Sequence, residues 1–93
     1  MKWFKEPEDS EGYSSRIDLS IGQDKVTLLC NVALTDIEER KVWILSVNEY
    51  YESYTHDHSY LLEGILIDMV LVKASHIVGE IVDSRITSRL EIC

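Results

Sequence analysis

The spacing of apolar residues follows two different periods along this chain, and this change of period limits the folds that the chain can adopt. In residues 15–21 and again in residues 25–34, apolar and polar side chains alternate. A period of two is typical of half-buried strands, and the short connection at Gly22 predicts that the two runs form a β-hairpin. Residues 35–40 are polar and predict a turn, and the β-branched and aromatic residues of 41–47 predict a third strand.

The period changes to that of a helix between Asn48 and Gly64. At about 100° per residue, the apolar and aromatic side chains of this segment fall on one side and its acidic side chains mostly on the other. Asn48 is a favourable N-cap, and Gly64 stands where a helix commonly ends in a left-handed cap. The sequence therefore predicts the main helix over residues 48–64. Its sheet-facing side is expected to consist of Tyr50, Tyr51, Tyr54, His58, Leu61, Leu62 and Ile65.

The remaining residues predict one further strand and one element whose type the pattern leaves open. Residues 65–73 are apolar on both faces, which is typical of a central strand, although Asp68 within it costs stability unless it is paired. Ser75 can cap a second helix over residues 76–86, whereas residues 85–92 also alternate as a strand would. The predicted fold class is therefore α+β: a small antiparallel β-sheet of order β-β-β-α-β, then a helix or hairpin, packed by one or two amphipathic helices.

Length and composition predict a single domain. With 93 residues, of which 45% are hydrophobic, the chain is long enough for one thin core and too short for two ordinary domains. Residues 1–12 contain Pro7 and several acids and are expected to be a flexible acidic lead-in to a single α+β domain over residues 13–93. No signal peptide or membrane-spanning run is recognisable, and Cys30 and Cys93 are expected to be free thiols, so the expected location is cytoplasmic.

Charge limits the partners that such a domain can have. The 17 acidic residues outnumber the 9 lysines and arginines, which gives a formal net charge of −8. Direct binding to nucleic acid or to an anionic membrane is therefore not expected, because both need clustered basic residues. A basic protein would instead be attracted by this charge.

Few residue clusters suggest chemistry. His56-Asp57-His58 would point both rings to one face of a strand, as a metal site requires, but on a helix the two rings lie on nearly opposite sides. Because the segment is predicted to be helical, no metal site is expected. Cys30 falls on a predicted core face, where a thiol acts as a small hydrophobic group rather than as a nucleophile. Since no phosphate-binding loop, serine elbow or CxxC motif is present, neither an enzyme nor a cofactor is expected.

The distribution of charge along the chain predicts a contact surface. From Val42 through Val72 there is no lysine or arginine, whereas five acids and four of the five tyrosines fall in this stretch. Acids beside aromatic side chains suit the recognition of a basic protein surface. The outward side of the predicted helix is expected to bind the partner through Glu49, Glu52, His56, Tyr60 and Glu63.

These features favour a small acidic binding or inhibitor module that occludes a basic protein, in the manner of an immunity protein, an antitoxin or a phage-type inhibitor. The expected partner is then a toxin or a nucleic-acid-processing enzyme. The alternative is a structural or assembly subunit that forms a homo-oligomer through the apolar strand over residues 65–73 or through the C-terminal segment. The salt dependence of association separates the two, because charge-driven capture weakens as salt rises.

Overall fold

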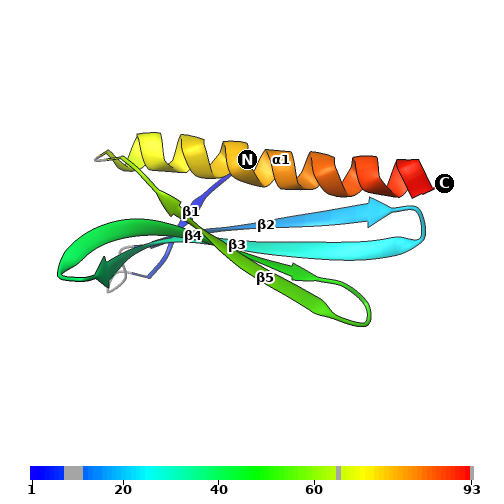
Figure 1. The fold of residues 1–93 in the computed structure, drawn as a ribbon, viewed down its shortest axis with the longest axis horizontal. Helices are drawn as coiled ribbons and strands as arrows, with labels where there is room; N and C mark the ends of the chain where they lie inside the picture. The colour runs from blue at the N-terminus through cyan, green and yellow to red at the C-terminus, as the bar shows by residue number, and fades with distance from the viewer. Residues whose placement is uncertain (8–11, 65, 93) are drawn as a thin grey trace.

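One antiparallel sheet and one long helix make up the fold. The computed structural model describes residues 1–7, 12–64 and 66–92, and of residues 88–92 it describes the backbone alone. Within this part of the chain the strands lie in sequential order, and the C-terminal helix crosses one face of the sheet (Figure 1). The elements are β1 (Phe4–Lys5), β2 (Gly12–Ile21), β3 (Asp24–Ile37), β4 (Arg40–Tyr50), β5 (Thr55–Leu62) and α1 (Ile67–Ile92). The predicted α+β class with an antiparallel sheet is therefore confirmed, and the described residues hold a single helix.

Strands β2, β3 and β4 form two long hairpins, each with a two-residue turn. Ile21 pairs with Asp24 across the first turn, where Gly22 has a φ of 65° that suits a tight hairpin. Inward and outward side chains alternate along all three strands, because successive side chains of a strand point to opposite faces. The predicted hairpin over residues 15–34 and the predicted third strand are confirmed.

The helix predicted over residues 48–64 is wrong. β4 continues to Tyr50, a short turn follows, and β5 then pairs with β4 along its whole length. The segment fits both periods, and the alternation places His56, His58, Tyr60 and Leu62 on the face of β5 that is turned towards α1. Thr55 and Tyr60 belong to residue types that favour strands. Tyr50 and Tyr54, which were expected to pack on the sheet, are exposed.

The strand predicted over residues 65–73 is also wrong, because α1 begins at Ile67. A short apolar run fits a buried strand and a buried helix equally well. Here Val70 is fully buried, whereas Val72, two positions further along the helix, is exposed. Asp68, which would be costly within a central strand, lies in the first helical turn, where the helix dipole favours a negative charge.

Gly64 permits the sharp connection between β5 and α1. Its φ of 154° is one that residues with side chains rarely adopt, and a Cβ atom there would lie 3.0 Å from Cγ2 of Val70. The helix then continues through residues 85–92, so the alternative of a C-terminal strand is wrong. The helix predicted over residues 76–86 is confirmed as the middle of α1, and Ser75 lies inside the helix instead of capping it.

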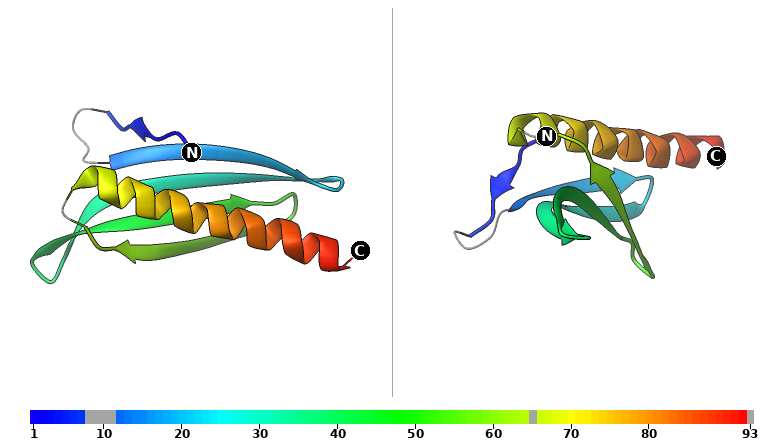
Figure 2. Two further views of the ribbon diagram at one scale, coloured as in Figure 1. Left: turned by 90° about the horizontal axis from the view of Figure 1, so that it is seen from above. Right: turned by 60° about the vertical axis from the view of Figure 1, so that its left-hand side comes forward.

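The core lies between α1 and the face of the sheet that α1 crosses. Figure 2 shows α1 on one side of the sheet, and within the described residues the other side carries no helix. β3 and β4 contribute alternate residues to the core, and α1 contributes residues spaced by three or four positions. The buried hydrophobic residues are Val26, Leu28, Cys30, Val32, Leu45, Val47, Leu62, Val70, Ala74, Val78 and Ile81.

The first seven residues are attached to the body of the domain. β1 pairs with β2, and the Trp3 indole nitrogen donates a hydrogen bond to the Ser75 hydroxyl of α1 at 2.8 Å. The flexible lead-in predicted over residues 1–12 stays a prediction. Residues 8–11 of that segment lie outside the described residues.

Candidate functional site

A carboxylate without any exposure to solvent interrupts the apolar core. Glu49 continues the inward series of β4 that includes Leu45 and Val47, and its exposed fraction is 0%. An ionised carboxylate is costly to bury unless charged or hydrogen-bonding partners surround it. The partners of Glu49 therefore define the candidate site.

Arg85 of α1 is the charged partner of Glu49. Its guanidinium binds both carboxylate oxygens, with Nε 2.8 Å from Oε1 and Nη2 2.9 Å from Oε2. Planar two-point contacts of this kind are among the strongest ion pairs in proteins. The side chain of Arg85 is itself 32% exposed, so it reaches the carboxylate from the rim of the helix–sheet interface.

Two further side chains complete the set of donors around Glu49. The Tyr51 hydroxyl donates to Oε1 at 2.6 Å, and Nε2 of His58 lies 2.7 Å from Oε2. Burial alone would raise the pKa of Glu49, but hydrogen bonds from Arg85, Tyr51 and His58 outweigh burial and lower this pKa to about 2. Burial and the neighbouring carboxylate raise the pKa of Tyr51 to about 12. At neutral pH the site therefore holds an ionised carboxylate and a protonated phenol.

β5 adds a row of histidine and tyrosine side chains beside this carboxylate. His56 pairs with Glu49 in the β4–β5 register, and the ring of His58 lies 5.0 Å from that of His56, centroid to centroid. Nδ1 of His58 lies 2.6 Å from the Tyr60 hydroxyl. With its proton on Nε2, the His58 ring therefore donates to Glu49 and accepts from Tyr60. The result is a chain of hydrogen bonds from Tyr60 through His58 to Glu49.

This network is accessible from two directions. Along the helix, a cleft of about 340 Å³ is lined by Tyr60, Ile77, Glu80, Ile81, Ser84 and Arg85. On the β5 side, His56 is exposed and the side chain of His58 is 18% exposed. One ligand atom each from Glu49, His56 and His58 lies within 4.8 Å of the others. Imidazole nitrogens and a carboxylate oxygen are common zinc ligands, so these three residues could hold a metal ion.

The five residues predicted to bind a partner do not share one outward face. The predicted helix is absent and Glu49 is buried, so the reason given for grouping them is wrong. Glu52 is exposed in the turn between β4 and β5, and Glu63 is exposed after β5. His56 is exposed near the same turn, whereas Tyr60 is half-buried against the Glu49 network. Partner binding by the exposed members stays a prediction.

Sequence reasoning missed Arg85 and Tyr51 as members of the site. One signal was available, because Glu49 continues the alternating, inward-facing series of Leu45 and Val47 in β4. A buried acid on such a face requires a basic partner. The identity of that partner could not be read from the sequence, since Arg85 lies 36 residues away.

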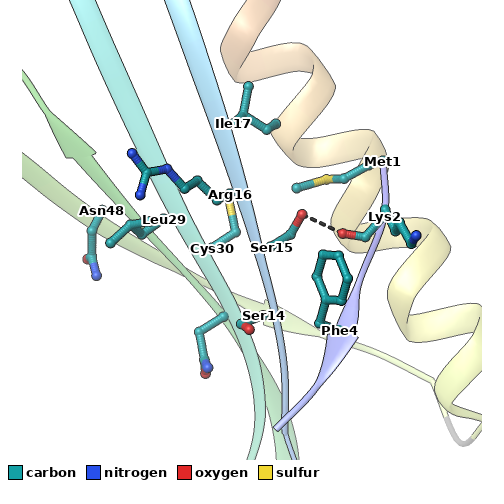
Figure 3. Close-up of a pocket in the computed structure, with 11 residues that line it drawn as sticks. Met1, Lys2, Phe4, Ser14, Ser15, Arg16, Ile17, Leu29, Cys30 and Asn48 are labelled. Carbon is teal, nitrogen blue, oxygen red and sulfur yellow. Dashed lines mark hydrogen bonds between the residues drawn. The ribbon is translucent and has the colours of Figure 1, made fainter.

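Cys30 does not provide a second reactive group. It is buried in the core as predicted, and burial raises the pKa of its thiol to about 11, so the thiolate does not form at neutral pH. Figure 3 shows Cys30 among the residues that line a surface cavity of about 490 Å³. In the same place the Ser15 hydroxyl donates to the carbonyl of Lys2 at 2.6 Å. Cys93, the other predicted free thiol, lies outside the described residues.

Comparisons with protein-family models, with curated proteins and with solved structures find no match for this chain. Among the described residues, no helix combines the length and the apolar character needed to cross a membrane. The function must therefore be inferred from the charge, the exposure and the contacts of the residues themselves.

Proposed function

We propose that this protein is a small acidic binding module that occludes a basic protein partner, and that it binds with the tip of the β4–β5 hairpin. The hairpin tip is defined as Tyr50, Glu52, Tyr54, His56 and Asp57. The observation that carries the proposal is the exposure of two tyrosines beside acids, since 40% of Tyr50 and 59% of Tyr54 is exposed. Tyrosine is enriched at the centre of protein interfaces, where it supplies contact area and a hydroxyl group.

The charge of the hairpin tip suits a basic partner. Glu52 and Asp57 are both exposed, and no lysine or arginine occurs from Val42 through Val72. Among the described contacts, two bases from elsewhere reach this stretch. The charge of Arg85 is matched by Glu49 inside the core, and Lys73 donates to the carbonyl of Glu63, which lies outside the hairpin tip. The negative electrostatic potential of the exposed acids at the tip is therefore not cancelled by these bases, and it speeds the encounter with a basic surface.

The hairpin tip is also held in place by the buried network. The ring of Tyr54 stacks on that of Tyr51, with the centroids 4.5 Å apart and the planes 9° from parallel. Tyr51 is in turn fixed by its hydrogen bond to Glu49. A contact residue that is ordered before binding loses less conformational entropy when the complex forms.

Kinetics of tip variants test this proposal. The partner is captured from a lysate of the source cells on immobilised protein, and its association and dissociation rates are then measured at several salt concentrations. Tyr54→Ala is expected to speed dissociation by about tenfold or more, since loss of an interface aromatic commonly costs at least about 1–2 kcal/mol. Glu52→Lys is expected to slow association and to flatten its salt dependence.

Glu80→Lys is the matched control for charge. Glu80 is 70% exposed on α1, outside the hairpin tip, and its replacement changes the net charge by the same amount as Glu52→Lys. Because Tyr54 is exposed, Tyr54→Ala is expected to leave the unfolding free energy within about 0.5 kcal/mol of the wild type. Wild-type rates in both tip variants, or equal effects of Glu52→Lys and Glu80→Lys, would count against the hairpin tip.

Self-association is the second candidate function, because apolar side chains are exposed where β5 ends and α1 begins. Leu61, Leu66, Met69 and Val72 are exposed by 63%, 64%, 51% and 69%. Leu61 and Val72 line one cleft of about 500 Å³. An assembly subunit would use such a surface. Sedimentation at rising protein concentration tests this candidate, and a dimer that persists at high salt and is lost in Val72→Glu would favour it over capture of a basic partner.

A further inference from the structure

Two histidines of β5 and the buried acid of β4 lie together on the α1-facing side of the sheet. His56 and His58 are two positions apart in a strand and therefore point to the same face, and Glu49 is the register partner of His56. The ligand atoms of these three residues all lie within 4.8 Å of one another. The third histidine of the chain, His76, is 77% exposed on α1 and is paired with Glu80.

We propose that Glu49, His56 and His58 form a binding site for one divalent transition-metal ion of the zinc class. Two imidazole nitrogens and one carboxylate oxygen suit Zn²⁺ and its neighbours Co²⁺ and Ni²⁺. Calcium and magnesium prefer sets of oxygen ligands and are not expected to bind here. The expectation of no metal site depended on a helix that placed the two rings on opposite sides, and that helix is absent.

Glu49 and His58 need little movement to bind such an ion. Oε2 of Glu49 and Nε2 of His58 are 2.7 Å apart. Two ligands of a tetrahedral zinc ion are about 3.3 Å apart, given metal–ligand distances of about 2.0–2.1 Å. The ion replaces the proton shared by these two atoms, and the pair opens by well under an ångström. Because His56 is exposed, its ring can turn to supply the third ligand.

Neighbouring side chains already orient the ligands. When Nε2 of His58 binds a metal ion, its Nδ1 carries the proton and donates to the Tyr60 oxygen, which lies 2.6 Å away. Metal-binding histidines commonly have a hydrogen-bond partner of this kind, and it fixes the ring. Arg85 holds the Glu49 carboxylate in place, but its positive charge also opposes the cation. The affinity is therefore expected to be lower than that of a structural zinc site without a nearby cation.

Three protein ligands leave one position of a tetrahedral ion open. Sites with three protein ligands and a water molecule are typical of zinc ions that bind or activate a further molecule. The exposed side of His56 places this position at the solvent edge of β5. A ligand atom from another molecule can therefore complete the site.

Calorimetric titration of Zn²⁺ into the untagged, metal-free protein at neutral pH tests the proposal. We expect saturable one-to-one binding, and with Co²⁺ we expect the visible absorption bands of a tetrahedral ion. Loss of a hydrogen bond that supports a ligand costs about 10–100-fold in metal affinity, so Tyr60→Phe is expected to weaken binding within that range. His56→Ala and His58→Ala each remove a ligand and are expected to weaken binding by more than this. His76→Ala is the matched control and should bind as the wild type does.

His56→Ala is the decisive variant, because His56 is exposed and contributes no hydrogen bond to the Glu49 network among the described contacts. An unchanged unfolding midpoint of metal-free His56→Ala verifies that the fold is intact. Lack of saturable binding by the wild type would overturn the proposal, as would wild-type affinity in His56→Ala or a loss in His76→Ala as large as that in His56→Ala. The titration contains no partner protein, so its outcome is independent of whether the hairpin tip binds one.

Discussion

Two regions of different chemistry hold α1 against the sheet. In the apolar region, Val70, Ala74 and Val78 form a core with valine and leucine side chains of β3 and β4. In the polar region, further along the same side of the helix, Arg85 reaches Glu49 of β4. The first region is stabilised by removal of apolar surface from water, which has no preferred direction. The second depends on two parallel hydrogen bonds with one geometry.

This difference determines what each region contributes to the protein. Apolar packing supplies most of the favourable free energy of folding, whereas a buried ion pair loses much of its attraction to the cost of desolvation. The Arg85–Glu49 contact instead fixes where α1 lies along β4, because it is the ion pair that joins α1 to the sheet among the described residues. It also fixes Tyr51 and His58, from which the hairpin tip and the proposed metal site extend.

The largest expected effect comes from breaking the polar region at Arg85. Arg85→Met leaves the Glu49 carboxylate buried without its charged partner, which typically costs about 3–5 kcal/mol of unfolding free energy. Chemical denaturation at neutral pH measures this loss. Arg16→Met is the matched control, because the Arg16–Asp18 ion pair is 65% exposed on both sides and exposed pairs contribute about 0–1 kcal/mol.

A double variant separates the contribution of the ion pair from the penalty of an unpaired buried charge. Glu49→Met combined with Arg85→Met removes both charges, and it is expected to be more stable than Arg85→Met alone. Equal losses in Arg85→Met and Arg16→Met would contradict the assignment of Glu49 as a buried charge that depends on Arg85.

The apolar region is expected to lose stability in alkali, because the buried Cys30 thiol ionises there. Burial raises the pKa of this thiol from 9.0 to about 11. A group whose pKa is raised by folding contributes stability that is complete below the unfolded pKa and is lost as the pH rises through the folded pKa, here between 9.0 and about 11. Since one pKa unit corresponds to about 1.4 kcal/mol, the loss approaches about 3 kcal/mol well above the folded pKa, and it is about 2 kcal/mol at the folded pKa itself.

Unfolding free energies of the wild type and of Cys30→Ala, measured at neutral pH and again at about pH 11, check this expectation. Cys30→Ala has no thiol to ionise, so its stability is expected to fall less with pH than that of the wild type. The same fall in both proteins would show that Cys30 does not control stability in alkali. Arg85→Met should retain the Cys30-dependent part of the fall, because the thiol is unchanged in that variant.

The sequence was sufficient for the parts of the fold that local pattern decides. In the β2–β3 hairpin, Ile17 pairs with Leu28 and Leu19 with Val26 across one short turn, so alternation alone aligns the inward residues. Residues 48–64 could not be assigned in this way, because their apolar and aromatic side chains fit a helical period as well as an alternating one. Pairing with β4 decides between the two, and that contact is not visible in the local pattern.

The candidate site could not be predicted from the sequence either, because it also depends on contacts between distant segments of the chain. Glu49 was assigned to an outward helix face, and its burial follows only once β4 is extended to Tyr50. Its partners come from β5, from α1 and from the turn between β4 and β5, with His58 nine residues and Arg85 36 residues away in the chain. The residue types near Glu49 therefore indicated an acidic stretch. In the fold, the charge of Glu49 is neutralised by its pairing with Arg85, and Glu52 and Asp57 nearby remain as exposed acids.

The smallest expected effect concerns the turn between β3 and β4, at the end of β4 opposite to Glu49. Glu38 and Glu39 both have positive φ, 49° and 64°, whereas the β2–β3 turn has Gly22 at its positive φ. Two-residue hairpin turns of this kind prefer Asn-Gly. A left-handed backbone costs a residue with a side chain about 1–2 kcal/mol, and the larger entropy loss of glycine on folding offsets about 0.5–1 kcal/mol of the gain.

Glu38→Asn with Glu39→Gly is therefore expected to raise the unfolding free energy by about 1 kcal/mol or slightly less. Glu38→Gln with Glu39→Gln is the control, because it removes both charges and leaves the backbone preference nearly unchanged. Since this turn is remote from Glu49, the gain should add to the loss caused by Arg85→Met. If the turn variant raised the unfolding free energy of the wild type but not that of Arg85→Met, the two ends of β4 would be energetically coupled. The Arg85–Glu49 pair would then affect the stability of parts of the sheet that it does not contact.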